Sequence, residues 1–200
     1  MPAMSLINNK KSNLVNHSLF LILFLLVASI HATAEEITNK ANLESEAMGI
    51  VKKFAGSLKP QLKKAIQSGG LEQAVNICSV EAPKIARELS EQTDWNIKRV
   101  SLKPRNNNAV PNDSEEKILQ QFNQRQIQGE SPSTITYSEI TNNKFRFMKA
   151  QSVEAICLNC HGKSVAPNVK NVIKQHYPED SAMGYSLGQI RGAFSLVKNL

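Results

Sequence analysis

The residues with the clearest chemical potential are two cysteines and a histidine in the stretch EAICLNCHG, residues 154–162. Cys157 and Cys160 are separated by two residues, and His161 follows directly. C-x-x-C-H is the attachment motif of c-type haem: both thiols form thioethers with the haem, and the histidine binds the iron from the proximal side. The motif predicts one covalent haem c, attached through Cys157 and Cys160, with His161 as a metal ligand.

Two other chemistries use similar residues. A thiol redox pair of the thioredoxin kind is expected after a strand in a βαβ unit, which the pattern of this chain does not indicate. A structural zinc site needs four ligands, and the three residues of the motif together with Cys78 could supply them. Haem is favoured over both by the motif itself and by the cellular compartment that the N-terminus indicates.

The N-terminus is typical of a secretory signal peptide. Lys10 and Lys11 precede an apolar run of 12 residues, 19–30, and the following HATAEE contains an A-x-A pattern. We expect a signal peptide at residues 1–34, cleaved after Ala34, and a periplasmic protein. An uncleaved anchor is the alternative, but a spanning helix needs about 20 apolar residues. Haem attachment by this motif also takes place outside the cytoplasm, so the two predictions support each other.

Length and charge narrow the class of protein. The sequence has 200 residues and a net charge of +7, so residues 35–200 suit a single domain with one core. Nucleic-acid binding is not expected, because no basic run is interleaved with aromatic residues. No membrane association is expected once the signal peptide has been removed.

The third cysteine, Cys78, would remain as a single free thiol if Cys157 and Cys160 both bind haem. A free thiol in an oxidising compartment is at risk of oxidation unless it is buried or coordinated, so its presence needs an explanation. Leu71, Ala74, Val75 and Cys78 follow the i, i+3, i+4, i+7 spacing of one helix face, so Cys78 should point inward. The candidates for the second axial position of a haem iron are Cys78, His176, Met148, Met183 and water. The residue pattern alone leaves this choice open.

Hydrophobic periodicity predicts helices in the first half of the chain. One helix is expected over 41–67, continuing through Pro60 with a kink and ended by Gly69 and Gly70. A short helix is expected over 71–78, and Pro83 fits the first turn of a third helix.

The second half reads as an antiparallel sheet with insertions. A strand is expected over 96–102, and a helix over about 114–128 with a capping box at Asp113 and Glu116. Two alternating segments flank a hairpin turn at 141–143, a short helical or irregular segment contains PNVKNVIKQHYP, and a closing strand lies in LGQIRGAFSLV. The predicted fold class is α+β, with about four antiparallel strands and N-terminal helices.

Several stretches together resemble one known family. They are AVNICSVEAPKIA, WNIKRVSLKPRN, CLNCHG, QHYPED and AMGYSLGQIRGAFSL, and the resemblance covers Ala47 to Val197. The family comprises exported bacterial proteins with a single c-type haem and a PAS-like fold, long catalogued as a domain of unknown function. In that family a proline usually follows RN and an aspartate usually follows the later proline, whereas Asn107 and Asn112 occupy these positions here.

The resemblance implies a PAS-like α+β fold and His/Cys axial ligation, with His161 as proximal and Cys78 as distal ligand. Haem propionates need cationic or hydrogen-bonding partners. The candidates within the family-like stretches are Arg99, Lys103, Arg105, Tyr185 and Arg191.

These predictions favour redox or gas sensing without turnover, since thiolate ligation stabilises ferric iron and can be lost on reduction. The expected partners are an unidentified redox or signalling protein and a small gas, NO or CO, on the reduced haem. A soluble single-haem electron carrier is the alternative. A small haem enzyme is less expected, because it needs an open distal site with a positioned acid–base group.

Overall fold

The computed structural model describes the backbone of residues 10–200 and the side chains of residues 38–200. The chain divides into two compact units, Met1–Leu43 and Glu44–Leu200. The predicted signal peptide, residues 1–34, lies outside the described side chains, and its cleavage stays a prediction. Within the described part of the chain, no helix combines the length and apolar character that a membrane span requires.

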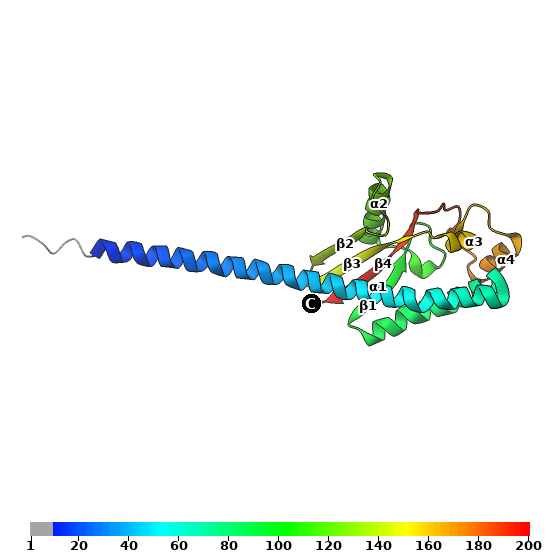
Figure 1. Ribbon diagram of the computed structural model, residues 1–200, viewed down its shortest axis with the longest axis horizontal. Coiled ribbons are helices and arrows are strands. Elements are labelled where there is room, and N and C mark those ends of the chain that lie inside the picture. The colour runs from blue at the N-terminus through cyan, green and yellow to red at the C-terminus, as the bar shows by residue number, and fades with distance from the viewer. Residues whose placement is uncertain (1–9) are drawn as a thin grey trace, which may run out of the picture. The chain divides into compact units, whose positions relative to one another are not determined.

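Helix α1, Lys10–Gln92, consists of two parts joined at Gly69 and Gly70, where the chain turns back (Figure 1). Gly70 has a φ of 71°, a left-handed conformation that glycine adopts without the penalty of a Cβ. The first part continues through Pro60, as expected.

The second part of α1 runs without interruption from residue 71 to 92. The prediction of a separate helix starting at Pro83 was therefore wrong. Proline removes one backbone hydrogen bond inside a helix, but the buried face formed by Val75, Ala82, Ile85 and Leu89 stays in phase across it. Packing of this face holds the helix together where the backbone pattern alone would allow it to end.

Four antiparallel strands follow in the spatial order β1-β4-β3-β2. Their bounds are β1 Trp95–Val100, β2 Thr136–Thr141, β3 Lys144–Ser152 and β4 Ile190–Asn199. The hairpin between β2 and β3 turns on Asn142 and Asn143, both with positive φ, as two-residue hairpin loops require. The predicted α+β fold with a four-stranded antiparallel sheet is confirmed.

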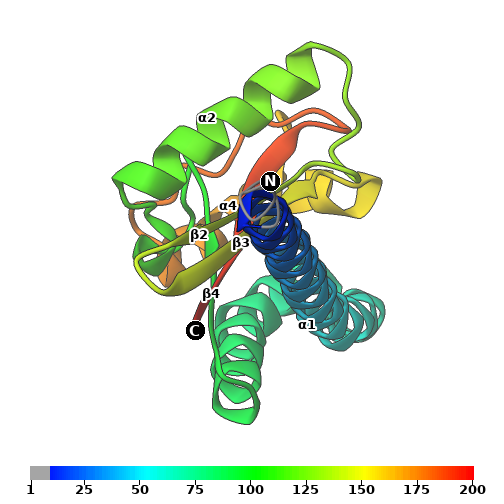
Figure 2. The same ribbon diagram turned by 90° about the vertical axis from the view of Figure 1, so that its left-hand side faces the viewer.

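Helices cover the sheet on both faces (Figure 2). On one face, Phe54 of α1 meets Phe194 of β4 with ring centroids 5.1 Å apart, and the Trp95 indole donates a hydrogen bond to Glu46. On the other face, α2, Asp113–Ile127, buries Ile118, Leu119 and Phe122 against the strands. The core is thus shared between two helix–sheet interfaces, and the sheet lies between them.

A capping box begins α2, but one residue earlier than the sequence suggested. Asn112 is the N-cap and accepts from the Glu115 amide, and the Glu115 carboxylate accepts from the Asn112 amide. Glu115 is fully buried and also binds Lys98 at 2.8 Å and the Ser195 hydroxyl at 2.7 Å. Asparagine is as good an N-cap residue as aspartate, so Asn112 satisfies the start of the helix.

The remaining elements are short and lie near one end of the sheet. Their bounds are η1 Asn107–Ala109, η2 Ala155–Cys157, α3 Leu158–His161 and α4 Pro167–His176. The predicted wrap after the C-x-x-C-H motif is thus a helix, α4, which buries Val169 and Ile173. These elements carry the motif and the loops that surround it.

Candidate cofactor cavity

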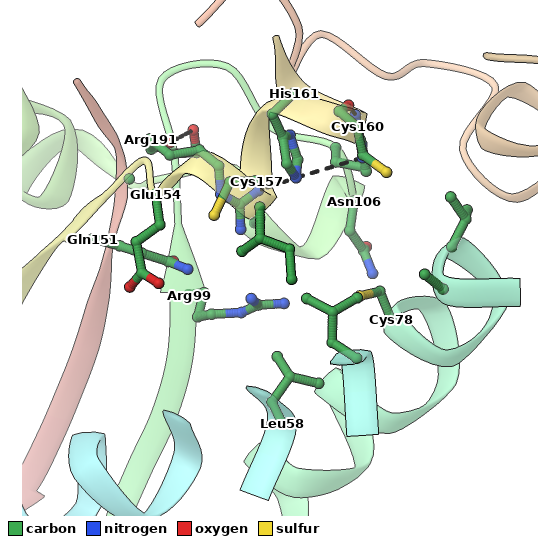
Figure 3. A pocket seen from close by; sticks show the side chains of 18 of the residues that line it. Leu58, Cys78, Arg99, Asn106, Gln151, Glu154, Cys157, Cys160, His161 and Arg191 are labelled. Carbon is green, nitrogen blue, oxygen red and sulfur yellow. Dashed lines mark hydrogen bonds between the residues drawn. The ribbon is translucent and has the colours of Figure 1, made fainter. Parts of the chain in front are cut away.

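A cavity lies where the end of the sheet meets both parts of α1 and the C-x-x-C-H segment (Figure 3). Its helical wall is apolar, with Leu58, Leu62 and Ile66 from the first part of α1 and Leu71, Ala74 and Val75 from the second. The sheet contributes Arg99, Gln151, Arg191 and Gly192. The cavity therefore combines an apolar wall with cationic groups.

The motif residues are brought to this cavity by two consecutive short helices. Cys157 ends η2, and α3 carries Cys160 and His161, so that all three side chains line the cavity. Gly162 ends α3 with its amide donating to the Leu158 carbonyl at 2.9 Å. A Cβ at Gly162 would collide with that carbonyl, so the tight end of the motif helix requires glycine.

The His161 imidazole is held with one nitrogen turned into the cavity. Its Nδ1 lies 2.7 Å from the Ala182 carbonyl oxygen, an acceptor, so Nδ1 carries the proton and Nε2 the lone pair. The guanidinium of Arg191 lies 3.2 Å from Nε2, and that of Arg105 lies 3.5 Å from it. Burial, reinforced by these two cations, lowers the pKa of His161 to about 2. The imidazole is therefore neutral, and Nε2 is available to a metal.

Cys78 faces the same cavity from the second part of α1, across from His161 (Figure 3). Burial raises the pKa of its thiol above the ordinary value, while Arg99, Arg191 and Arg105 act in the opposite direction. The group is thus a neutral thiol without a metal, and its cationic surroundings favour the thiolate once a metal replaces the proton.

The other residues considered for the second axial position lie elsewhere. His176 is exposed, with Nε2 at 2.6 Å from the Asn76 side-chain oxygen. Met148 is fully buried in the core beneath α2, and Met183 packs against the cluster around α4. Of these candidates, the structure brings Cys78 to the cavity and leaves His176, Met148 and Met183 outside its lining.

Arg99 and Arg191 are cations without a carboxylate partner among the described side chains. Arg99 stacks over the Phe54 ring at 5.2 Å, and burial, together with the charge of Arg191, lowers its pKa to about 10. The guanidinium of Arg191 meets the neutral His161 imidazole, not an acid. Two partly buried, uncompensated cations beside one cavity are suited to anionic groups of a ligand.

Three other predicted propionate partners have protein partners of their own. Arg105 lines the cavity but forms a salt bridge with Asp180 at 3.0 Å. Lys103 donates to the Met183 carbonyl and lies 4.6 Å from the centroid of the Tyr185 ring, and the Tyr185 hydroxyl donates to the Arg191 carbonyl at 3.3 Å. Lys103 and Tyr185 are not brought to the cavity lining and instead stabilise the loop beside it.

Sequence reasoning missed Tyr177, Asp180 and the pair formed by Lys59 and Glu154. Tyr177 lines the cavity, and Asp180 binds Arg105. Lys59 and Glu154, both about half exposed, form a salt bridge of 2.5 Å between α1 and the segment before η2. The stretch QHYPED contains Tyr177 and Asp180, so it was the available signal for two of these residues.

The cysteines and His161 do not form a compact metal cage. In the part of the chain with described side chains, no group of three or more His, Cys, Asp or Glu residues is arranged to hold a metal ion. A structural zinc ion needs four protein ligands at about 2.0–2.3 Å. The alternative of a zinc site formed by the motif and Cys78 is therefore not supported by the geometry.

The fold and the site define an α+β protein with a cationic cavity. The sheet and both parts of α1 form part of the cavity wall, and the C-x-x-C-H segment forms another part. The chain belongs to the Tll0287-like family, whose model matches residues 28–198. Among solved structures, it resembles "Crystal structure of the cyanobacterial heme-protein Tll0287", with 24% identity and a TM-score of 0.57. The match covers 77% of this chain and 95% of that one. No curated protein sequence matches.

Proposed function

We propose that this chain is an exported c-type haem-binding protein that holds one haem between His161 and Cys78 and senses redox state or a small gas, without catalytic turnover. The observation that carries the proposal is the position of Cys78, which faces the cavity opposite His161, with Cys157 and Cys160 on the same wall as the histidine. Membership of the Tll0287-like family and the likeness to a haem protein support haem binding.

The residues of the cavity fit a c-type haem. The two motif cysteines would hold it covalently, and the apolar side chains of both parts of α1 would contact the ring. Arg99 and Arg191, which have no acidic partner among the described residues, would neutralise the propionates. When bound, the haem supplies a one-electron couple whose potential depends on its axial ligands.

Cys78 is the residue on which sensing would depend. A thiolate stabilises ferric iron more than ferrous iron. The burial that raises the pKa of Cys78 also favours return of a proton to its sulfur once the metal loses positive charge. We propose that Cys78 is a firm ligand in the oxidised protein and a weak one in the reduced protein, which opens a position for CO or NO.

The test compares the haem-loaded protein with its Cys78→Ala variant. We expect the variant to lose the ferric absorption and resonance Raman features of thiolate ligation and to have a higher midpoint potential. The matched control is His176→Ala, which removes a candidate ligand from outside the cavity and should leave the ferric spectrum unchanged. An unchanged spectrum in Cys78→Ala would exclude Cys78 as a ligand and with it the proposed sensing.

A soluble electron carrier is the second candidate, favoured by the charge of α1 beside the cavity. Between Glu46 and Glu72 the helix carries no acidic residue and five lysines, Lys52, Lys53, Lys59, Lys63 and Lys64, all of them exposed. The same segment lines the cavity with Leu58, Leu62 and Ile66. Such a basic surface would steer an acidic redox partner toward the haem. A carrier should keep both axial ligands on reduction, whereas a sensor should not.

A further inference from the structure

A buried salt bridge between Arg105 and Asp180 lies beside His161. Arg105 donates from Nε to Asp180 Oδ1 at 3.0 Å and from one Nη to Oδ2 at 3.2 Å, a two-bond arrangement that fixes both side chains. The two side chains are 12% and 6% exposed. This pair therefore places one positive and one negative charge, well shielded from water, next to the site.

Arg105 connects this pair to the C-x-x-C-H motif. The same Nη donates to the Cys160 carbonyl at 2.6 Å and reaches the Ala182 carbonyl at 3.4 Å. The other Nη lies 3.5 Å from His161 Nε2, the nitrogen turned into the cavity. The guanidinium therefore lies alongside the imidazole. It contacts the backbone of the motif and the Ala182 carbonyl, which also accepts the hydrogen bond from His161 Nδ1.

Asp180 fixes the same residue, Ala182, through its backbone amide. Its Oδ1 accepts the Ala182 amide at 2.9 Å, and the Ala182 carbonyl accepts the proton of His161 Nδ1 at 2.7 Å. An outer partner of a ligating histidine fixes its tautomer and orientation and tunes its basicity. Here that partner is a backbone carbonyl whose position depends on Asp180 and Arg105.

We infer that Arg105 and Asp180 are positioning residues that orient His161 and, as opposed charges, set the reduction potential of the site. This inference rests on the proposed haem function. It also assigns Arg105 a different role from that of a propionate partner. The charges of the intact pair cancel, so removal of either one leaves the other uncompensated in a poorly hydrated place.

The two charges predict shifts of opposite sign. In Asp180→Asn, the remaining guanidinium disfavours ferric iron, and the midpoint potential should rise. In Arg105→Gln, the remaining carboxylate favours ferric iron, and the Ala182 carbonyl also becomes a stronger acceptor for His161, so the potential should fall. Each shift should change the ferric-to-ferrous ratio at a fixed potential by about tenfold, which is 59 mV for a one-electron couple.

The experiment is a spectroelectrochemical titration of haem-loaded wild type, both single variants, the double variant Asp180→Asn/Arg105→Gln, and Arg105→Lys. The double variant should have a midpoint between those of the two single variants, because neither charge remains. Arg105→Lys keeps the positive charge but loses the two-bond geometry. Its ferric-to-ferrous ratio at a fixed potential should lie within threefold of the wild-type ratio. Glu115→Gln is the matched control, because it removes a buried, ion-paired carboxylate on the other face of the sheet and should leave the midpoint unchanged.

The possible results separate the inference from the function on which it rests. A wild-type protein without covalent haem would refute the proposed function and this inference together. Haem-loaded single variants that shift in the same direction, or not at all, would refute the inference alone, since loosening of the loop has no reason to produce opposite signs. If one single variant fails to fold, a shift in Arg105→Lys as large as tenfold would still refute it.

Discussion

Protonation of His161 should dominate the pH dependence of stability in the haem-free protein. The folded protein holds this imidazole neutral, with a pKa of about 2, whereas the ordinary value is 6.5. Below pH 6.5 the unfolded chain therefore binds a proton that the folded chain does not bind. Stability falls as the pH decreases through 6.5 and continues to fall until the folded pKa is reached.

The size of this effect follows from the two pKa values. One pH unit below the unfolded pKa corresponds to about 1.4 kcal/mol per proton. Between pH 7 and pH 5, the free energy of unfolding should therefore decrease by about 2 kcal/mol because of His161 alone. The carboxylates of exposed Glu46 and buried Glu115 have pKa values lowered from 4.5 by their hydrogen bonds, so the stabilisation they give is lost only below this window.

Urea denaturation of haem-free protein at a series of pH values measures the effect. His161→Asn should abolish most of the slope between pH 7 and pH 5, and His176→Asn, a change at an exposed histidine, should retain it. Arg191→Leu should also retain the slope in this window, because burial, the main cause of the lowered pKa of His161, keeps the folded imidazole neutral above pH 5. Equal slopes in wild type and His161→Asn would show that the imidazole is not held neutral in the fold, and the argument for a ready metal ligand would fail.

Two further changes test the supports of the site. Glu115→Gln should lower the free energy of unfolding by about 2–3 kcal/mol, measured in urea. The change removes the fully buried carboxylate that binds Lys98 and Ser195. The haem spectrum should stay unchanged. Lys52→Glu/Lys63→Glu should slow reduction by an acidic electron-transfer protein and weaken its dependence on salt; equal rates for the variant and the wild type would remove the support for docking on this helix.

Local pattern was sufficient for most of the fold. The strands, the hairpin turn at Asn142 and Asn143 and the helix end at Gly70 were predicted because each depends on residues close in sequence. The helix break at Pro83 was predicted wrongly, because the continuity of that helix depends on packing of its buried face. The capping box was displaced by one residue because Asn112 and Asp113 are both good N-caps, and the choice rests on which register buries Glu115.

For the site, the sequence alone determined the attachment motif and the inward face of Cys78, because both follow from spacing along one segment. Only the tertiary structure decided that Cys78 and His161 share a cavity although they lie far apart in the chain. It also showed that Arg99 and Arg191 lack acidic partners among the described residues, whereas Arg105 binds Asp180. Which charges compensate one another depends on contacts between distant loops, and periodicity within one segment carries no information about such contacts.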